Sequence, residues 1–183
     1  MKDMTNEHSK AQFTAQPLKP NTGQSWAFVV LPQAVSAVLA RRGRITVIAT
    51  INGYAFEALL EPDGKKSHWL RIDKEQLELS GAVIGADALF EVVAVDKEPE
   101  PEVPADLVNA LQASSEAQTT WHATTTIARL DWIHWITSAK QQKTRTKRIN
   151  DACNMLASGK KRVCCFDSSG FYSKAFSAPQ AAD

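Results

Sequence analysis

Apolar and polar residues alternate with a period of two over residues 44–51, which predicts a strand with one buried face. The dipeptide Asn52-Gly53 follows, and it is a strong signal for a tight hairpin turn into a partner strand at 54–60. Runs rich in β-branched and aromatic residues predict further strands at 13–18, 26–31, 68–72 and 88–95. Five or six short strands predict a small barrel or sandwich, because closure protects edges that an open sheet exposes.

The pattern changes after residue 104, where apolar residues recur at helical spacing. We expect helices over 105–111, 115–122, 126–139 and 144–156. The two patterns together predict an α+β protein, with a small N-terminal β-barrel followed by a C-terminal helical segment.

An acidic, proline-punctuated stretch, residues 97–104, separates the two patterns and is expected to be an extended, solvated linker. The predicted organisation is therefore a disordered tail over 1–10, the β-barrel domain over 11–96 and the linker over 97–104. A helical segment over 105–160 and a loosely ordered C-terminal tail over 161–183 complete it.

Composition places the protein among ordinary folded chains, and its 183 residues carry a net charge of +1. We expect a cytoplasmic protein with no membrane span, because the sequence shows neither a secretory signal nor a long apolar stretch. The three cysteines are odd in number and two are adjacent, which indicates reduced thiols.

The strongest chemical asymmetry is a cationic stretch in the helical segment. Residues 129–162 contain nine Lys or Arg residues and only two acidic residues. On a continuous helix, residues 140, 144 and 148 fall on one face, with residue 145 beside them. We therefore predict a site for an anionic small molecule or protein partner, formed by Lys140, Thr144, Arg145 and Arg148.

The simpler alternative for this stretch is a solvated helix face, or a face that pairs with Glu98, Glu100 and Glu102 of the linker. Trp121, Trp132 and Trp135 lie close to the basic residues in sequence, so nucleic-acid binding through base stacking is an alternative function. Helical spacing favours a core role for these tryptophans. An enzyme whose site forms between barrel and helices is a further alternative.

No catalytic, metal or cofactor motif is visible in the sequence, so we predict none of these sites. The four histidines have no partner at metal-ligand spacing. The segment Asp167-Ser168-Ser169-Gly170 lacks the glycine that a nucleophile elbow requires, and no phosphate-binding glycine loop is present.

Residues 138–149, SAKQQKTRTKRI, resemble the "AK..TR..RI" signature of the YdeI or OmpD-associated (OmdA-like, bacteriocin-protection) family. Upstream, the segments 26–32, 50–53, 85–87 and 103–107 resemble the domain of unknown function that commonly precedes it. The resemblance implies a double-split β-barrel followed by an OmdA-like helical segment. It also implies a bacterial protein connected with protection against bacteriocins or antimicrobial peptides, in a setting of envelope stress.

Overall fold

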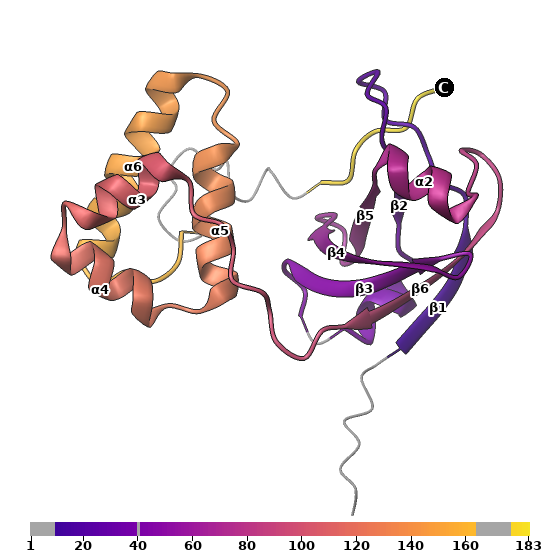
Figure 1. Cartoon of the computed structure of the whole chain (residues 1–183), viewed down its shortest axis with the longest axis horizontal. Coiled ribbons are helices and arrows are strands. Elements are labelled where there is room, and N and C mark those ends of the chain that lie inside the picture. The colour runs from indigo at the N-terminus through magenta and orange to yellow at the C-terminus, as the bar shows by residue number, and fades with distance from the viewer. Residues whose placement is uncertain (1–9, 40, 164–176) are drawn as a thin grey trace, which may run out of the picture. The chain divides into compact units, whose positions relative to one another are not determined.

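The structure is a computed structural model of the chain, and it describes all residues except 1–9, 40 and 164–176 (Figure 1). The chain forms two compact units. Unit 1 consists of Met1–Glu98 together with Phe176–Asp183, and unit 2 consists of Pro99–Ala175. Unit 2 is therefore inserted, in sequence, between two segments of unit 1. None of the helices in the described part of the chain is long and apolar enough to cross a bilayer.

Unit 1 contains a six-stranded antiparallel sheet that curls into a half-barrel (Figure 1). The order of strands in the sheet is β1-β6-β3-β4-β5-β2. Two short helices, α1 (Gln33–Ala37) and α2 (Lys74–Ser80), lie between strands in the sequence. The strands are β1 (Lys10–Ala15), β2 (Ala27–Val30), β3 (Ile45–Ile51), β4 (Tyr54–Pro62), β5 (His68–Ile72) and β6 (Ala88–Ala94).

The β3–β4 hairpin confirms the predicted alternation. The four alternate apolar residues of β3 are all buried, whereas Ile48 between them is exposed. Asn52 and Gly53 have φ angles of 48° and 87°, the positive values that a tight two-residue hairpin turn needs. The side chain of Asn52 also accepts a hydrogen bond from the backbone N–H of Leu89, 3.0 Å away, which ties the turn to β6.

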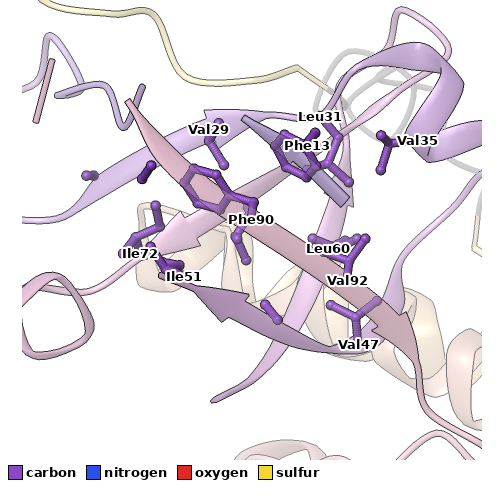
Figure 2. Close-up of a cluster of buried hydrophobic side chains, with 14 of the residues drawn as sticks. Phe13, Val29, Leu31, Val35, Val47, Ile51, Leu60, Ile72, Phe90 and Val92 are labelled. Carbon is purple, nitrogen blue, oxygen red and sulfur yellow. The ribbon is translucent and has the colours of Figure 1, made fainter. Parts of the chain in front are cut away.

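The core of unit 1 lies inside the curl of the sheet, where side chains from all six strands meet (Figure 2). Phe13 of β1 and Phe90 of β6 stack with their ring centroids 5.1 Å apart. Ile51, Leu60 and Phe90 are completely buried. Each such side chain stabilises the fold by about 1.5–3 kcal/mol relative to an exposed one, so this cluster holds the sheet in its curled form.

The described part of unit 2 is a bundle of four helices, as the sequence pattern predicts. They are α3 (Ala105–Gln112), α4 (Ser115–Ala123), α5 (Thr126–Thr137) and α6 (Gln142–Ala157). Ser114 and Thr125 cap α4 and α5 through side-chain hydrogen bonds to the third residue beyond them. The apolar faces enclose a second core, which includes Leu107, Trp132 and Leu156, each completely buried. The predicted α+β class, with a small N-terminal β-barrel followed by helices, is confirmed, and the barrel takes the form of a curled half-barrel sheet.

The segments predicted to be solvated or loosely ordered make specific contacts where the structure describes them. Lys10, predicted to end the N-terminal tail, is the first residue of β1. Val163 is 1% exposed in the core of unit 2, and Ala181 forms a backbone bridge with Pro20 in unit 1. The linker residue Glu98 accepts a 2.9 Å hydrogen bond from the backbone N–H of Thr46. The remaining parts of both predicted tails, 1–9 and 164–176, lie outside the described residues.

Candidate functional site

Helix α6 carries most of the cationic stretch, and its packing decides which basic side chains face outward. Ile149, Ala152 and Leu156 are buried on its core side. The helix begins at Gln142, so Lys140 lies in the turn that precedes it. The single continuous helical face assumed for Lys140, Thr144 and Arg148 is therefore not formed. The sequence pattern predicted a break between these two helices at residues 140–143, and the structure has it at residues 138–141.

Arg145 is engaged within unit 2. Its Nε donates to Asp106 Oδ2 at 2.7 Å, and its Nη2 donates to Asp106 Oδ1 at 3.1 Å. This two-bond contact lowers the pKa of the Asp106 carboxyl below its ordinary value of 3.8, chiefly through the hydrogen bond from Arg145. The same hydrogen bond raises the pKa of Arg145. Asp106 lies in the first turn of α3, so the pair joins the start of α3 to α6.

Arg148 is engaged at the end of α5. Its Nη1 donates to the Trp135 carbonyl oxygen at 2.6 Å and to Ser138 Oγ at 3.3 Å. The guanidinium carbon also lies over the Trp135 ring, 5.5 Å from its centroid. The last carbonyl groups of a helix have no partner inside that helix, so a cation placed there satisfies them. Arg148 therefore caps the end of α5.

Arg129 holds the linker to unit 2. Its Nη2 and Nε donate to the two carboxylate oxygens of Glu100 at 2.7 and 3.2 Å. Its Nη1 donates to the carbonyl oxygens of Trp121 and Thr124, which lie at the end of α4. The guanidinium group of Arg129 thus satisfies carbonyl groups at the end of α4 and also holds Glu100 of the linker against the bundle. The alternative in which the basic stretch 129–162 pairs with the acidic linker is therefore realised at this position, between Arg129 and Glu100.

Two lysines remain exposed at the start of α6. The side chains of Lys140 and Lys143 form no hydrogen bond or ion pair with the described residues. The N-cap residue Gln141 gives no side-chain cap, and the first turn contains no acidic residue. The backbone N–H groups of Gln142, Lys143 and Thr144 belong to the first turn, where a helix supplies no partner. Several donors and two positive charges therefore meet at one helix end.

The comparisons with known proteins divide the chain at the same place as the structure. Residues 100–159 match the family described as OmdA, "Bacteriocin-protection, YdeI or OmpD-Associated". Residues 13–92 match a domain of unknown function, DUF1905. We name the two units after these matches: unit 2 is the OmdA unit and unit 1 is the DUF1905 unit. The OmdA match begins at Glu100, the residue held by Arg129, and covers α3 to α6, while the DUF1905 match covers nearly all of the curled sheet. Among curated proteins, no sequence matches the chain.

The tryptophans of the OmdA unit belong to its core, as helical spacing predicts. Trp121 and Trp135 are 5% exposed, and Trp132 is completely buried. Trp132 Nε1 donates to the Lys161 carbonyl oxygen at 3.1 Å, which holds the chain after α6 against the bundle. Because their faces are packed against other side chains, these rings offer no platform for stacking bases. Trp135 Nε1 is buried without a hydrogen-bond partner among the described residues.

A buried polar network in the DUF1905 unit was not predicted from the sequence. Ser36 Oγ lies 2.9 Å from both His68 Nδ1 and Ser67 Oγ, and it accepts from the His68 backbone N–H at 3.0 Å. His68 Nε2 lies 2.9 Å from the Gly43 carbonyl oxygen. Both ring nitrogens are occupied and His68 is 2% exposed, so this network joins α1 and the loop before β3 to β5. We therefore assign this network a structural role.

The cysteines provide no activated nucleophile where they are described. Burial raises the pKa of the Cys153 thiol, which disfavours the reactive thiolate. The adjacent pair Cys164 and Cys165, and the serine segment 167–170, lie outside the described residues. In the described part of the chain, no group of three or more His, Cys, Asp or Glu residues has the geometry to hold a metal ion.

Proposed function

We propose that the chain is a cytoplasmic binding protein whose OmdA unit holds an anionic group at the start of α6. The ligand is a phosphate or carboxylate carried by a small molecule or a protein partner. Its contacts are the side chains of Lys140 and Lys143, the hydroxyl of Thr144 and the N–H groups of the first helical turn. The family description connects its members with bacteriocin protection. We propose that anion binding at α6 serves that protection.

The observation that supports this proposal is the composition of the first turn of α6. The positive end of a helix dipole is stabilised by acidic side chains and destabilised by cations. Here the turn has no acid and no side-chain cap, while Lys143 lies within it and Lys140 just precedes it. An anion bound at this end would satisfy the backbone donors and neutralise both lysines.

Arg145 and Arg148 enter the proposal in a different role from the one that the sequence suggested. Their guanidinium groups are held by Asp106 and by the end of α5, respectively. We assign both arginines to positioning α6, so that its first turn is presented at a fixed place on the bundle. Direct contacts to the ligand then come from lysines, which bind phosphate as point charges.

The proposal is tested by NMR on the full chain, with inorganic phosphate, a polyglutamate peptide and single-stranded DNA as separate probes. We expect the backbone amide signals of Gln142, Lys143 and Thr144 to shift and saturate with at least one probe. The double variant Lys140→Ala/Lys143→Ala should then weaken binding roughly tenfold, because it removes two charge-assisted contacts.

A matched double variant controls for net charge. Lys65→Ala/Lys97→Ala removes two exposed lysines from unit 1 and should leave the affinity within twofold of the parent chain. Equal weakening in both double variants would show a diffuse charge effect and overturn the site. First-turn amides that do not respond to any probe would overturn it as well. A response to DNA alone would favour the nucleic-acid alternative.

A further inference from the structure

The C-terminal residues of the chain pair with residues 19–21 of unit 1 through an isolated antiparallel bridge. The Asn21 N–H donates to the Gln180 carbonyl oxygen, and the Ala182 N–H donates to the Lys19 carbonyl oxygen, each at 2.8 Å. Pro20 and Ala181 face each other between these bonds as an antiparallel bridge. In Figure 1 the yellow C-terminal segment runs beside the indigo N-terminal chain of unit 1.

Residues 18–21 are the surface to which this tail binds, and they have two hydrogen-bonding edges. Leu18 exchanges both of its backbone hydrogen bonds with Phe28 of β2, at 2.8 and 2.9 Å. Lys19 and Asn21 direct their backbone groups to the opposite side, toward the tail. Without the tail, the Lys19 carbonyl and the Asn21 N–H would be unpaired edge groups, which readily accept another extended chain.

The chemistry of the tail suits a ligand that is recognised through its backbone. The side chains of Gln180, Ala181 and Ala182 are exposed, so they contribute little to the contact. Ala178 and Pro179 are half-buried and add the only partly covered side chains of the segment 177–183. Two backbone hydrogen bonds with so little apolar burial make a weak contact, and its attachment to the same chain raises its effective concentration.

We propose that the edge Leu18–Asn21 is a strand-addition site for an extended peptide and that the segment 177–183 is its resident, exchangeable ligand. The site recognises its ligand through backbone hydrogen bonds rather than through side chains, as is general for strand addition. The proposal is independent of the anion site on α6. It predicts that the same seven residues bind in trans to a chain that lacks them.

Two neighbouring proline variants provide a matched test in the full chain. Ala182→Pro removes the N–H that donates to Lys19, whereas Ala181→Pro removes an N–H that points away from residues 19–21. The readout is hydrogen exchange of the Asn21 amide, measured by NMR. We expect roughly tenfold faster exchange in Ala182→Pro and a change below twofold in Ala181→Pro. The Phe28 amide, paired with Leu18, should stay protected in both.

A truncated chain that ends at residue 176 completes the test. The synthetic peptide of residues 177–183 should restore protection of the Asn21 amide, with a Kd on the order of 1 mM, and the peptide carrying the Ala182→Pro change should not. The proposal is overturned if the two proline variants behave alike. It is also overturned if the truncated chain, with the Phe28 amide still protected, does not respond to the peptide at several times that concentration.

Discussion

The pairing of Arg145 with Asp106 leads to a measurable coupling between two residues 39 positions apart. Two charge-assisted hydrogen bonds join them, but the side chains keep 26% and 40% of their exposure. Solvent screens a pair with this exposure, so its coupling free energy should lie at the upper end of the range for surface ion pairs. We expect a coupling free energy of about 1 kcal/mol. In a domain of this size that corresponds to a shift in Tm of about 4–8 °C.

A double-mutant cycle in the full chain measures this coupling. Arg145→Met keeps the aliphatic stem and removes the charge, and Asp106→Ala removes its partner. Urea unfolding followed by circular dichroism at 222 nm reports mainly on the helical unit. The double variant should be less destabilised than the sum of the two single variants by about 1 kcal/mol. The exposed i,i+4 pair Lys147 and Asp151 is the control, with an expected coupling of about 0.3–0.5 kcal/mol.

The same cycle has a defined pH dependence. Because Arg145 lowers the pKa of Asp106, the folded chain holds this carboxylate ionised to a lower pH than the unfolded chain does. The stabilisation is therefore complete above the unfolded value near 3.8 and is lost as the pH falls through the folded value. Free energies that add within about 0.3 kcal/mol at pH 7 would refute the reasoning, because Arg145 would then be available to a ligand.

Two further predictions concern buried groups. Ser36→Ala leaves the backbone N–H of His68 without its acceptor inside unit 1, so it should destabilise the protein by about 2 kcal/mol in urea unfolding. The control is Gln33→Ala in the same helix, which removes an exposed hydrogen bond and should destabilise the protein by less than about 0.5 kcal/mol. Equal costs would contradict the assignment of a buried network. In a variant that retains Cys153 as its one cysteine, iodoacetamide at pH 8 should react several-fold more slowly than with the urea-unfolded chain, because burial raises the pKa of the thiol. Equal rates would contradict this.

Elements set by local pattern could be predicted, whereas contacts between distant residues could not. The β3 alternation and the Asn52-Gly53 turn depend on neighbouring residues, and both were confirmed. The four helices were predicted within a few residues for the same reason. The partner of Arg145 depends on how α3 and α6 pack, and nothing near Arg145 in sequence identifies Asp106. One local feature does mark Asp106 as a candidate partner, because it is an acidic residue in the first turn of a helix that begins after a proline.

The contacts of the buried histidine and of the C-terminal tail also join residues that are distant in the sequence, so they could not be predicted either. Ser36 and His68 meet because the curled sheet brings β5 beside α1, and a single histidine in a strand pattern carries no mark of its partner. The tail pairs through backbone groups of Lys19 and Asn21, which every sequence supplies, so composition could not predict that contact. The alternative of an enzyme site formed by both halves of the chain stays a prediction.

The basic residues of unit 2 have different roles because arginine and lysine differ in their side-chain chemistry. Three arginines of unit 2, Arg129, Arg145 and Arg148, each use two or more guanidinium hydrogen bonds to join elements that the core alone would leave unlinked at the surface. The guanidinium group presents its donors in a fixed planar arrangement that matches a carboxylate or two helix carbonyls, whereas the ammonium of lysine carries its three donors on a flexible stem without that fixed geometry. The number of basic residues in the sequence therefore overestimates how many of them are available to bind an anion. The charges left for an external anion at the start of α6 are lysines, and replacing them should change binding with little change in stability.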